Sequence, residues 1–274
     1  MSDGTTHPDR RHIRWLVPLP VIAAAALLAV GVAGYLTLRT GQVEQPASAL
    51  LSAGMVATGV GTIDSLRLPD GTRIVVGPLS SIKIAEGYGT DSREVEVRGD
   101  VYFEVVHDSS GPFTVHALGA TVQDIGTKFT VRTDAAEGVA VSVSEGSVSL
   151  RSTNQAEVRA RVVLQRGERG VLMPDGQTVK RRGTADDMAW LRGQLVFREA
   201  PITEVTSALH RWYGIELRVP DASLATRHIT ATFSSEPPER VLEVIRLALG
   251  AQLERRGDTV IVTRAKGAGV ARLR

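Results

Sequence analysis

Residues 94–105 read EVEVRGDVYFEV, and this run decides the fold class of the chain. Side chains of a β-strand alternate between its two faces, so apolar residues at every second position predict a strand with one buried face. We expect Gly99-Asp100 to bend this strand in its middle. The same alternation places Asp100 and Glu104 on the face opposite the apolar residues, which predicts a solvated surface there. The apolar positions are Val95, Val97, Val101, Phe103 and Val105.

The alternation continues on both sides of this run. Two apolar segments, residues 66–68 and 74–76, flank Pro69-Asp70-Gly71, a typical turn sequence that is repeated at Pro174-Asp175-Gly176. The segment Gly146–Leu150 echoes Gly99–Phe103. Many short strands at regular spacing predict a mainly β domain over residues 58–182, built of stacked short strands as a sandwich or a solenoid. Other alternating positions are Phe113, Val115, Phe129, Val131, Val139, Val141 and Val143.

The last quarter of the chain contains an internal repeat with a 36-residue offset. Each half reads as a strand, a helix that begins at Pro, a Gly at the helix end, and a second strand. Residues 188–264 therefore predict a small α+β domain of two β-α-β repeats, followed by a basic tail over residues 265–274. The matched positions are Phe197, Pro201, Val205, Leu209, Gly214 and Leu217 in the first half and Phe233, Pro237, Val241, Ile245, Gly250 and Leu253 in the second.

The N-terminal region contains a candidate membrane span, because residues 15–38 carry no charged side chain. A helix of this length measures about 36 Å, enough to cross a hydrocarbon core. Arginines are denser before the span than after it, which predicts a cytoplasmic stub (1–14), a transmembrane helix (15–38), a linker (39–57) and the remainder outside the cytoplasm. A cleaved signal peptide is the alternative, since residues 46–49 offer a small-residue cleavage site. The flanking residues are Arg10, Arg11, Arg14, Trp15, Tyr35 and Arg39.

Composition argues against several kinds of chemistry. The chain has no cysteine, which excludes thiol nucleophiles, disulfides and cysteine metal sites. Its formal net charge is only +2, so we expect no nucleic-acid partner. The six histidines show no HExxH or His-x3-His spacing. We therefore expect a protein that is not an enzyme and that needs no cofactor or metal.

Several motifs together resemble the FecR family of bacterial signal-relay proteins. Residues 188–264 are in turn similar to the short N-terminal domain of secretins and TonB-dependent receptors, which here opens with WLRGQLVF at 190–197. The motifs of residues 58–150 that carry the resemblance are Leu68–Thr72, Ser81, Arg93–Val95, Gly99–Val105, Pro112-Phe113, Gly126–Phe129 and Val143–Val148.

The resemblance implies a periplasmic regulator anchored in the inner membrane. Such a protein relays a signal from an outer-membrane TonB-dependent transducer to an extracytoplasmic-function sigma factor, by protein–protein binding. Family members usually carry a Trp-containing helical sigma-binding domain before the anchor, whereas 14 residues precede Trp15 here. Either the gene start is misplaced or this member has lost direct sigma binding. The alternative function is an anchored or secreted envelope-binding or structural module without a sigma-factor role.

The expected partner is the signalling domain of the transducer. A small β-α-β domain has sheet edges that can accept a partner strand, with main-chain hydrogen bonds for affinity and side chains for selectivity. The sequence does not say which strand is that edge. The candidates are Leu195, Val196 and Phe197 in one strand and Val260, Ile261 and Val262 in another.

Overall fold

The computed structural model describes residues 54–109, 111–124, 126–153 and 161–265. The predicted stub, the span and its flanking residues Arg10, Arg11, Arg14, Trp15, Tyr35 and Arg39 lie outside this part of the chain, as does nearly all of the basic tail. Among the described residues, no helix is both long and apolar enough to cross a membrane. All of them belong to one compact unit.

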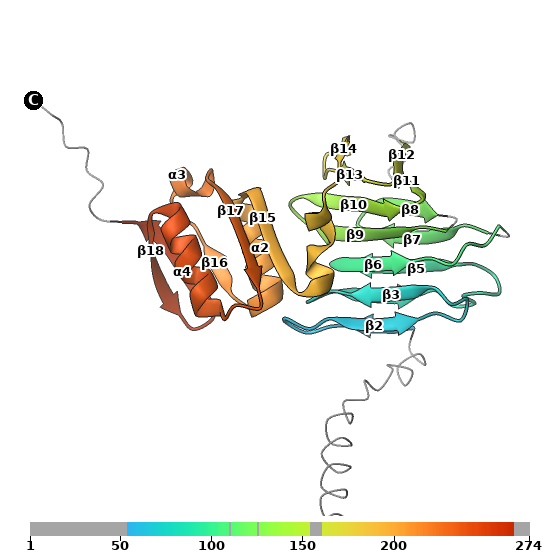
Figure 1. The fold of residues 1–274 in the computed structure, drawn as a ribbon, viewed down its shortest axis with the longest axis horizontal. Coiled ribbons are helices and arrows are strands. Elements are labelled where there is room, and N and C mark those ends of the chain that lie inside the picture. The colour runs from blue at the N-terminus through green and yellow to red at the C-terminus, as the bar shows by residue number, and fades with distance from the viewer. Residues whose placement is uncertain (1–53, 110, 125, 154–160, 266–274) are drawn as a thin grey trace, which may run out of the picture. The chain divides into compact units, whose positions relative to one another are not determined.

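The larger part of this unit is a β-sandwich of two seven-stranded sheets (Figure 1). Neighbouring strands are antiparallel except for β5 and β7, which are parallel. The mainly β prediction is confirmed. In order across the first sheet, the strands are β1 (Met55–Ala57), β4 (Ser81–Ile84), β5 (Glu94–Arg98), β7 (Phe113–Ala117), β8 (Ala120–Asp124), β11 (Ser147–Ser152) and β12 (Val162–Gln165). Across the second they are β14 (Thr178–Arg182), β13 (Glu168–Leu172), β10 (Gly138–Glu145), β9 (Lys128–Asp134), β6 (Asp100–Glu104), β3 (Arg73–Val76) and β2 (Asp64–Arg67).

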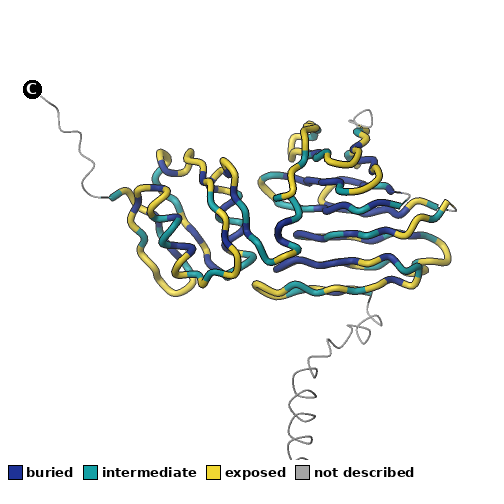
Figure 2. Tube along the Cα trace, viewed as in Figure 1, coloured by how far each residue is buried: buried dark blue, intermediate teal, exposed yellow. Residues whose placement is uncertain are grey.

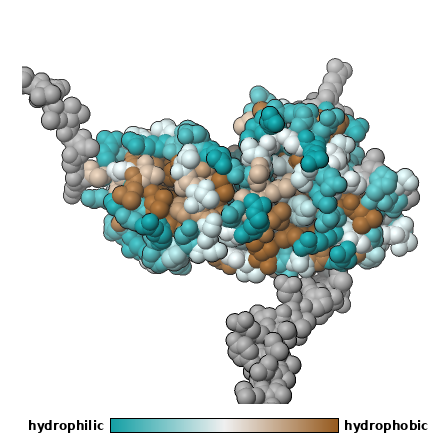
Figure 3. All heavy atoms as spheres, viewed as in Figure 1, coloured by the Kyte–Doolittle hydropathy of each residue, from teal (hydrophilic) through white to brown (hydrophobic). Residues whose placement is uncertain are grey.

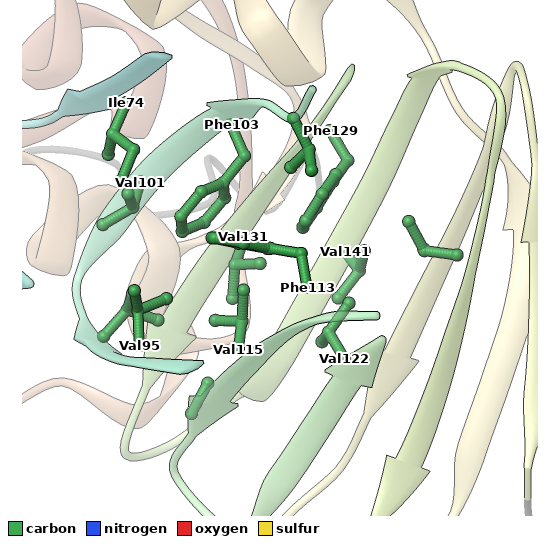
Figure 4. Close-up of a cluster of buried hydrophobic side chains, with 14 of the residues drawn as sticks. Ile74, Val95, Val101, Phe103, Phe113, Val115, Val122, Phe129, Val131 and Val141 are labelled. Carbon is green, nitrogen blue, oxygen red and sulfur yellow. The ribbon is translucent and has the colours of Figure 1, made fainter. Parts of the chain in front are cut away.

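The sandwich is held together by apolar side chains of its strands. Figure 2 shows long buried stretches along these strands. Three phenylalanines occupy the centre of this core, where the Phe103 ring stacks on Phe129 at 5.1 Å and lies 5.5 Å from Phe113 (Figure 4). All three are fully buried. Truncation of one such ring to Ala typically costs about 3–5 kcal/mol, so these few residues carry much of the stability of the sandwich.

The run that predicts one bent strand forms two strands in different sheets. β5 ends at Arg98, β6 begins at Asp100, and Gly99 turns the chain from the first sheet into the second with φ 84°. Gly146 makes the reverse turn, from β10 in the second sheet to β11 in the first, with φ 78°. The echo between the two sequence segments is therefore a repeated corner, where Gly accepts a φ that other residues rarely adopt.

Residues 194–264 form the two expected β-α-β repeats around a separate hydrophobic core. The first repeat contains β15 (Gln194–Pro201), α2 (Ile202–Tyr213) and β16 (Glu216–Arg218), and the second contains β17 (His228–Ser234), α4 (Pro238–Leu249) and β18 (Ala251–Arg256). A final strand, β19 (Thr259–Arg264), follows, and the helices η3 (Ala185–Arg192) and α3 (Ala222–Ala225) complete the described elements.

The helix boundaries follow the repeat closely. Gly214 and Gly250 cap the C-termini of α2 and α4 in the left-handed conformation, as expected. Pro201 and Pro237 lie one position earlier than predicted, at the N-cap rather than in the first turn. Their fixed φ near −65° suits the extended residue that enters the helix.

Candidate partner-binding site

One of the two predicted strand edges is open. β15 pairs with β17 in a two-stranded sheet and has no strand on its other side in the part of the chain that the structure describes. Leu195 and Phe197 turn into the core, whereas Val196 is half-buried on the opposite face. The outer edge of Leu195, Val196 and Phe197 therefore has no strand partner among the described residues.

The prediction that Val260, Ile261 and Val262 form a sheet edge is wrong. β19 lies in the middle of a three-stranded sheet, with the parallel strand β16 on one side and the antiparallel strand β18 on the other. The backbone groups of Val260, Ile261 and Val262 are thus engaged on both sides, and Val260 and Val262 are completely buried. No partner strand can add there without breaking the sheet.

A β-bulge limits the length of the open edge. The register between β15 and β17 shifts between Phe197 and Ala200, and Glu199 adopts a positive φ of 47°. The Glu199 N–H donates to the hydroxyl of Thr230 at 3.0 Å, and that hydroxyl donates to the Glu199 carboxylate at 3.1 Å. A bulge interrupts regular pairing and twists the strand, so the regular edge extends from Gln194 to Phe197.

A cavity of about 150 Å³ adjoins β15 and is lined by charged side chains. Residues 194–198 form one part of its wall, and Trp190 of η3 forms another. The Trp190 ring is itself buried and packs against the backbone of Gly77, where a Cβ atom would lie 3.2 Å from the ring. The charged residues that line the cavity include Asp100, Arg132, Arg169, Glu204 and Arg211.

Asp100 is buried, which corrects the predicted solvated surface at this position. Only 2% of the residue is exposed. Arg132 Nε of the neighbouring strand β9 donates to its Oδ1 at 2.6 Å, and Arg211 Nε of α2 lies 3.4 Å from Oδ2. Burial alone would raise the pKa of Asp100, but the charges of Arg132 and Arg211 outweigh it and hold this pKa below its usual value. Asp100 is therefore a buried anion between two cations.

The same two arginines, Arg132 and Arg211, also form ion pairs with acidic residues of α2 and β9. Arg132 Nη1 lies 3.7 Å from Glu204, and Arg211 Nη1 lies 3.7 Å from Asp134. Near the end of α2, the Arg211 carbonyl also accepts a hydrogen bond from the Gly61 N–H at 3.0 Å. We call Asp100, Arg132, Asp134, Glu204 and Arg211 the ion cluster. It links two sandwich strands to the first helix of the repeat domain.

A second pair lies beside this cluster. Arg169 Nη1 of β13 donates to Asp187 Oδ1 of η3 at 2.7 Å, with both side chains largely buried. The other oxygen of Asp187 accepts from the Thr184 N–H at 2.8 Å and so caps η3. This pair fixes η3, and thereby the start of β15, onto the sandwich.

Two family models match this chain, one on each part of the fold. A family model described as FecR protein matches residues 55–149, and a second, described as FecR, C-terminal, matches residues 194–262. No curated protein matches the chain.

Two solved structures resemble it over most of its length. Both are crystal structures of a candidate anti-sigma factor from Parabacteroides distasonis, with TM-scores of 0.70 and 0.69. Each is 25% identical to this chain and covers 77% of it and 99% of the solved chain. The two family models together span more than half of the sequence, one on the sandwich and one on the repeat domain. The chain therefore belongs to the FecR family.

Proposed function

We propose that this protein is a non-enzymatic regulator of an extracytoplasmic-function sigma factor that relays a signal from an outer-membrane TonB-dependent transducer. The two FecR matches and the resemblance to a candidate anti-sigma factor support the regulatory role. The uncharged run over residues 15–38 and the arginine bias around it support an inner-membrane anchor with the described domains in the periplasm.

The transducer's signalling domain adds a strand to β15. The observation that carries this proposal is the open edge from Gln194 to Phe197, next to a cavity with charged walls. Strand addition takes affinity from main-chain hydrogen bonds and selectivity from alternate side chains. On β15 the outward-facing side chains are those of Gln194, Val196 and Arg198, none of which is buried.

A proline scan of Gln194, Leu195, Val196 and Phe197 tests this proposal. Successive residues of a strand direct their N–H groups to opposite sides, so the scan includes donors to β17 and donors on the open edge. A proline on the open side removes a donor needed by the partner strand and leaves the β17 pairing intact. We expect these variants to keep their melting temperature and to lose transducer binding.

The control is the same scan at Gln252 and Leu253 of β18, a strand that also has one unpaired edge among the described residues. Proline variants of β18 that remain folded should bind the transducer normally. If every fold-keeping variant of β15 also binds normally, the contact lies elsewhere. The anchor is tested separately: a reporter that is active only in the cytoplasm should be silent when fused after Arg274.

A further inference from the structure

We infer that the edge of β14 is a second docking site, for an extended acidic protein segment that adds to the sandwich as its next strand. It concerns another strand edge than the proposed transducer contact, because β14 and β15 belong to different sheets, and the two regions share Arg181, which also lines the cavity beside β15. It rests on five exposed cations at one end of the sandwich, which we call the basic edge: Arg161, Arg166, Lys180, Arg181 and Arg182.

β14 leaves one backbone edge unpaired. It is the last strand of the second sheet and pairs only with β13, from Glu168↔Arg182 to Leu172↔Thr178. Its last four residues are exposed on both faces, so β14 projects beyond the apolar core. β12, the last strand of the other sheet, lies next to it, since Lys180 Nζ donates to the Val163 carbonyl at 3.0 Å.

The charges of the basic edge are largely unneutralised. Lys180 pairs with Glu168 at 2.7 Å, and Arg161 donates to the hydroxyl of Ser149. In the described ranges, the guanidinium groups of Arg166, Arg181 and Arg182 have neither an ion pair nor a hydrogen bond within the chain. Hydrophilic side chains cover the upper surface at this end of the sandwich (Figure 3).

Arginines on the end strands β16 and β18 have acidic partners within the chain. On β16, Arg218 binds Glu216 at 2.9 Å, and on β18, Arg256 binds Glu254 at 2.7 Å. Arg255 of β18 binds Glu239 at 3.3 Å. On β2, Arg67 has no acidic partner in the described ranges and donates to the Gly71 carbonyl at 3.0 Å. The basic edge therefore differs from the other end strands in gathering several cations without a partner in one place.

The geometry defines the chemistry of the partner. Side chains of adjacent strands lie about 5 Å apart on each face, so an added strand would place its residues beside those of β14. Lys180 and Arg182 project from one face of β14, and Arg181 projects from the other. Guanidinium groups bind carboxylates through paired hydrogen bonds. A segment with Asp or Glu on both faces, and an apolar residue opposite the exposed Val179, matches this edge.

Edge protection is the competing explanation. Charged residues on an end strand prevent one copy of a protein from pairing with another. The two explanations differ in what happens when the charges are removed. Protection predicts self-association of an Arg181→Ala/Arg182→Ala variant and no affinity for acidic peptides, whereas a docking site predicts that such affinity exists and is lost.

The experiment uses the full chain in detergent and three fluorescent peptides. The first alternates Glu-Glu with Val, the second replaces every Glu by Gln, and the third keeps Glu but carries N-methyl groups on alternate residues. Binding is followed by fluorescence anisotropy at low and high salt. We expect the first peptide to bind, with affinity that falls as salt rises, and the other two to bind at least about tenfold more weakly.

The matched variants are Arg181→Glu/Arg182→Glu on β14 and Arg255→Glu/Arg256→Glu on β18, which change the net charge equally. Only the first should lose peptide binding, again by about tenfold or more, with an unchanged melting temperature. Equal binding of the N-methylated peptide would overturn strand addition, and equal loss in both variants would overturn the site. If the β14 variant does not fold, the three peptides on the unaltered protein still decide between the outcomes.

Discussion

Asp70 shows how one carboxylate can hold together a turn and a buried cation. It belongs to the turn between β2 and β3, where its Oδ1 accepts from the Thr72 N–H at 2.9 Å. Its Oδ2 accepts from Tyr88 at 2.8 Å and from Arg93 Nη2 at 2.7 Å. Arg93 is only 7% exposed, so it depends on this anion. The Pro-Asp-Gly sequence predicts the turn but not the second role.

The two Pro-Asp-Gly turns allow these roles to be separated. Asp175 accepts a turn hydrogen bond from the Gln177 N–H at 3.0 Å. Asp70→Asn leaves the Arg93 guanidinium without its anion, so we expect a loss of about 3 kcal/mol in the free energy of unfolding. Asp175→Asn should cost under about 1 kcal/mol, because only a turn bond is weakened. Urea unfolding of both variants provides the measurement.

The same change should alter the response to acid. Burial raises the pKa of Asp70, but hydrogen bonds from Thr72, Arg93 and Tyr88 outweigh it, so this pKa is below its usual value. A lowered carboxyl pKa contributes stability above the pKa of the unfolded chain, about 3.9, and loses it as the pH falls towards the folded pKa. Asp70→Asn should therefore lose less stability than the unaltered protein below about pH 4. If the free energy of unfolding falls with equal slope against pH in both proteins, this assignment is contradicted.

Burial of Asp100 could not be predicted from its own strand. Alternation assigns Asp100 to the face of the strand opposite Val101. The structure agrees, since Val101 belongs to the sandwich core and Asp100 does not. It does not reveal that Arg211 of α2, more than a hundred positions later in sequence, meets that face. Contacts between elements far apart in the chain lie beyond any local pattern.

At the scale of elements, the local signals were the most informative. The 36-residue offset predicts both helices, and their glycine caps follow from it. Strand order is less accessible, because pairing joins distant residues. Val260 and Val262 are both fully buried in β19, the central strand of its sheet. Their alternation predicts one buried face. An edge strand and a central strand can both have such a face, so the alternation does not tell the two apart.

Gly99 illustrates why one apparent strand forms two. An ideal Cβ at this position would overlap the Ser80 hydroxyl oxygen, in addition to the positive φ. Gly89 has a nearly identical φ of 83° but nothing within 4 Å of such a Cβ. The two glycines thus separate backbone strain from steric overlap.

Alanine at each of these positions tests the corner. Gly89→Ala should lower the free energy of unfolding by about 1 kcal/mol, from backbone strain alone. Gly99→Ala should cost about 2–4 kcal/mol, because Ser80 must also move. Thermal unfolding of the two variants compares them directly. Equal losses would show that the contact with Ser80 adds nothing.

At the scale of the whole molecule, the described chain contains two hydrophobic cores that share no residue. Asp100 and Arg132 belong to the strands of the first core, and Arg211 belongs to a helix of the second. The ion cluster is therefore a polar link between two separately packed parts. In the proposed relay, this link would carry the effect of a strand bound at β15 towards the sandwich.

A double-mutant cycle between Asp100 and Arg211 measures that link. Asp100→Asn leaves two buried guanidiniums with less negative charge, and Arg211→Met removes one cation while keeping similar length. We expect each to lower the free energy of unfolding by about 2–4 kcal/mol, with a coupling energy of about 1–3 kcal/mol between them. Arg218→Met, which breaks only the pair with Glu216 on the surface, should change little.

Because the two cores are separate, calorimetry of the double variant should resolve two unfolding steps that lie further apart than in the unaltered protein. A coupling energy near zero would mean that Arg211 does not hold α2 on the sandwich, and the relay would then need another route, through η3 and the Arg169–Asp187 pair.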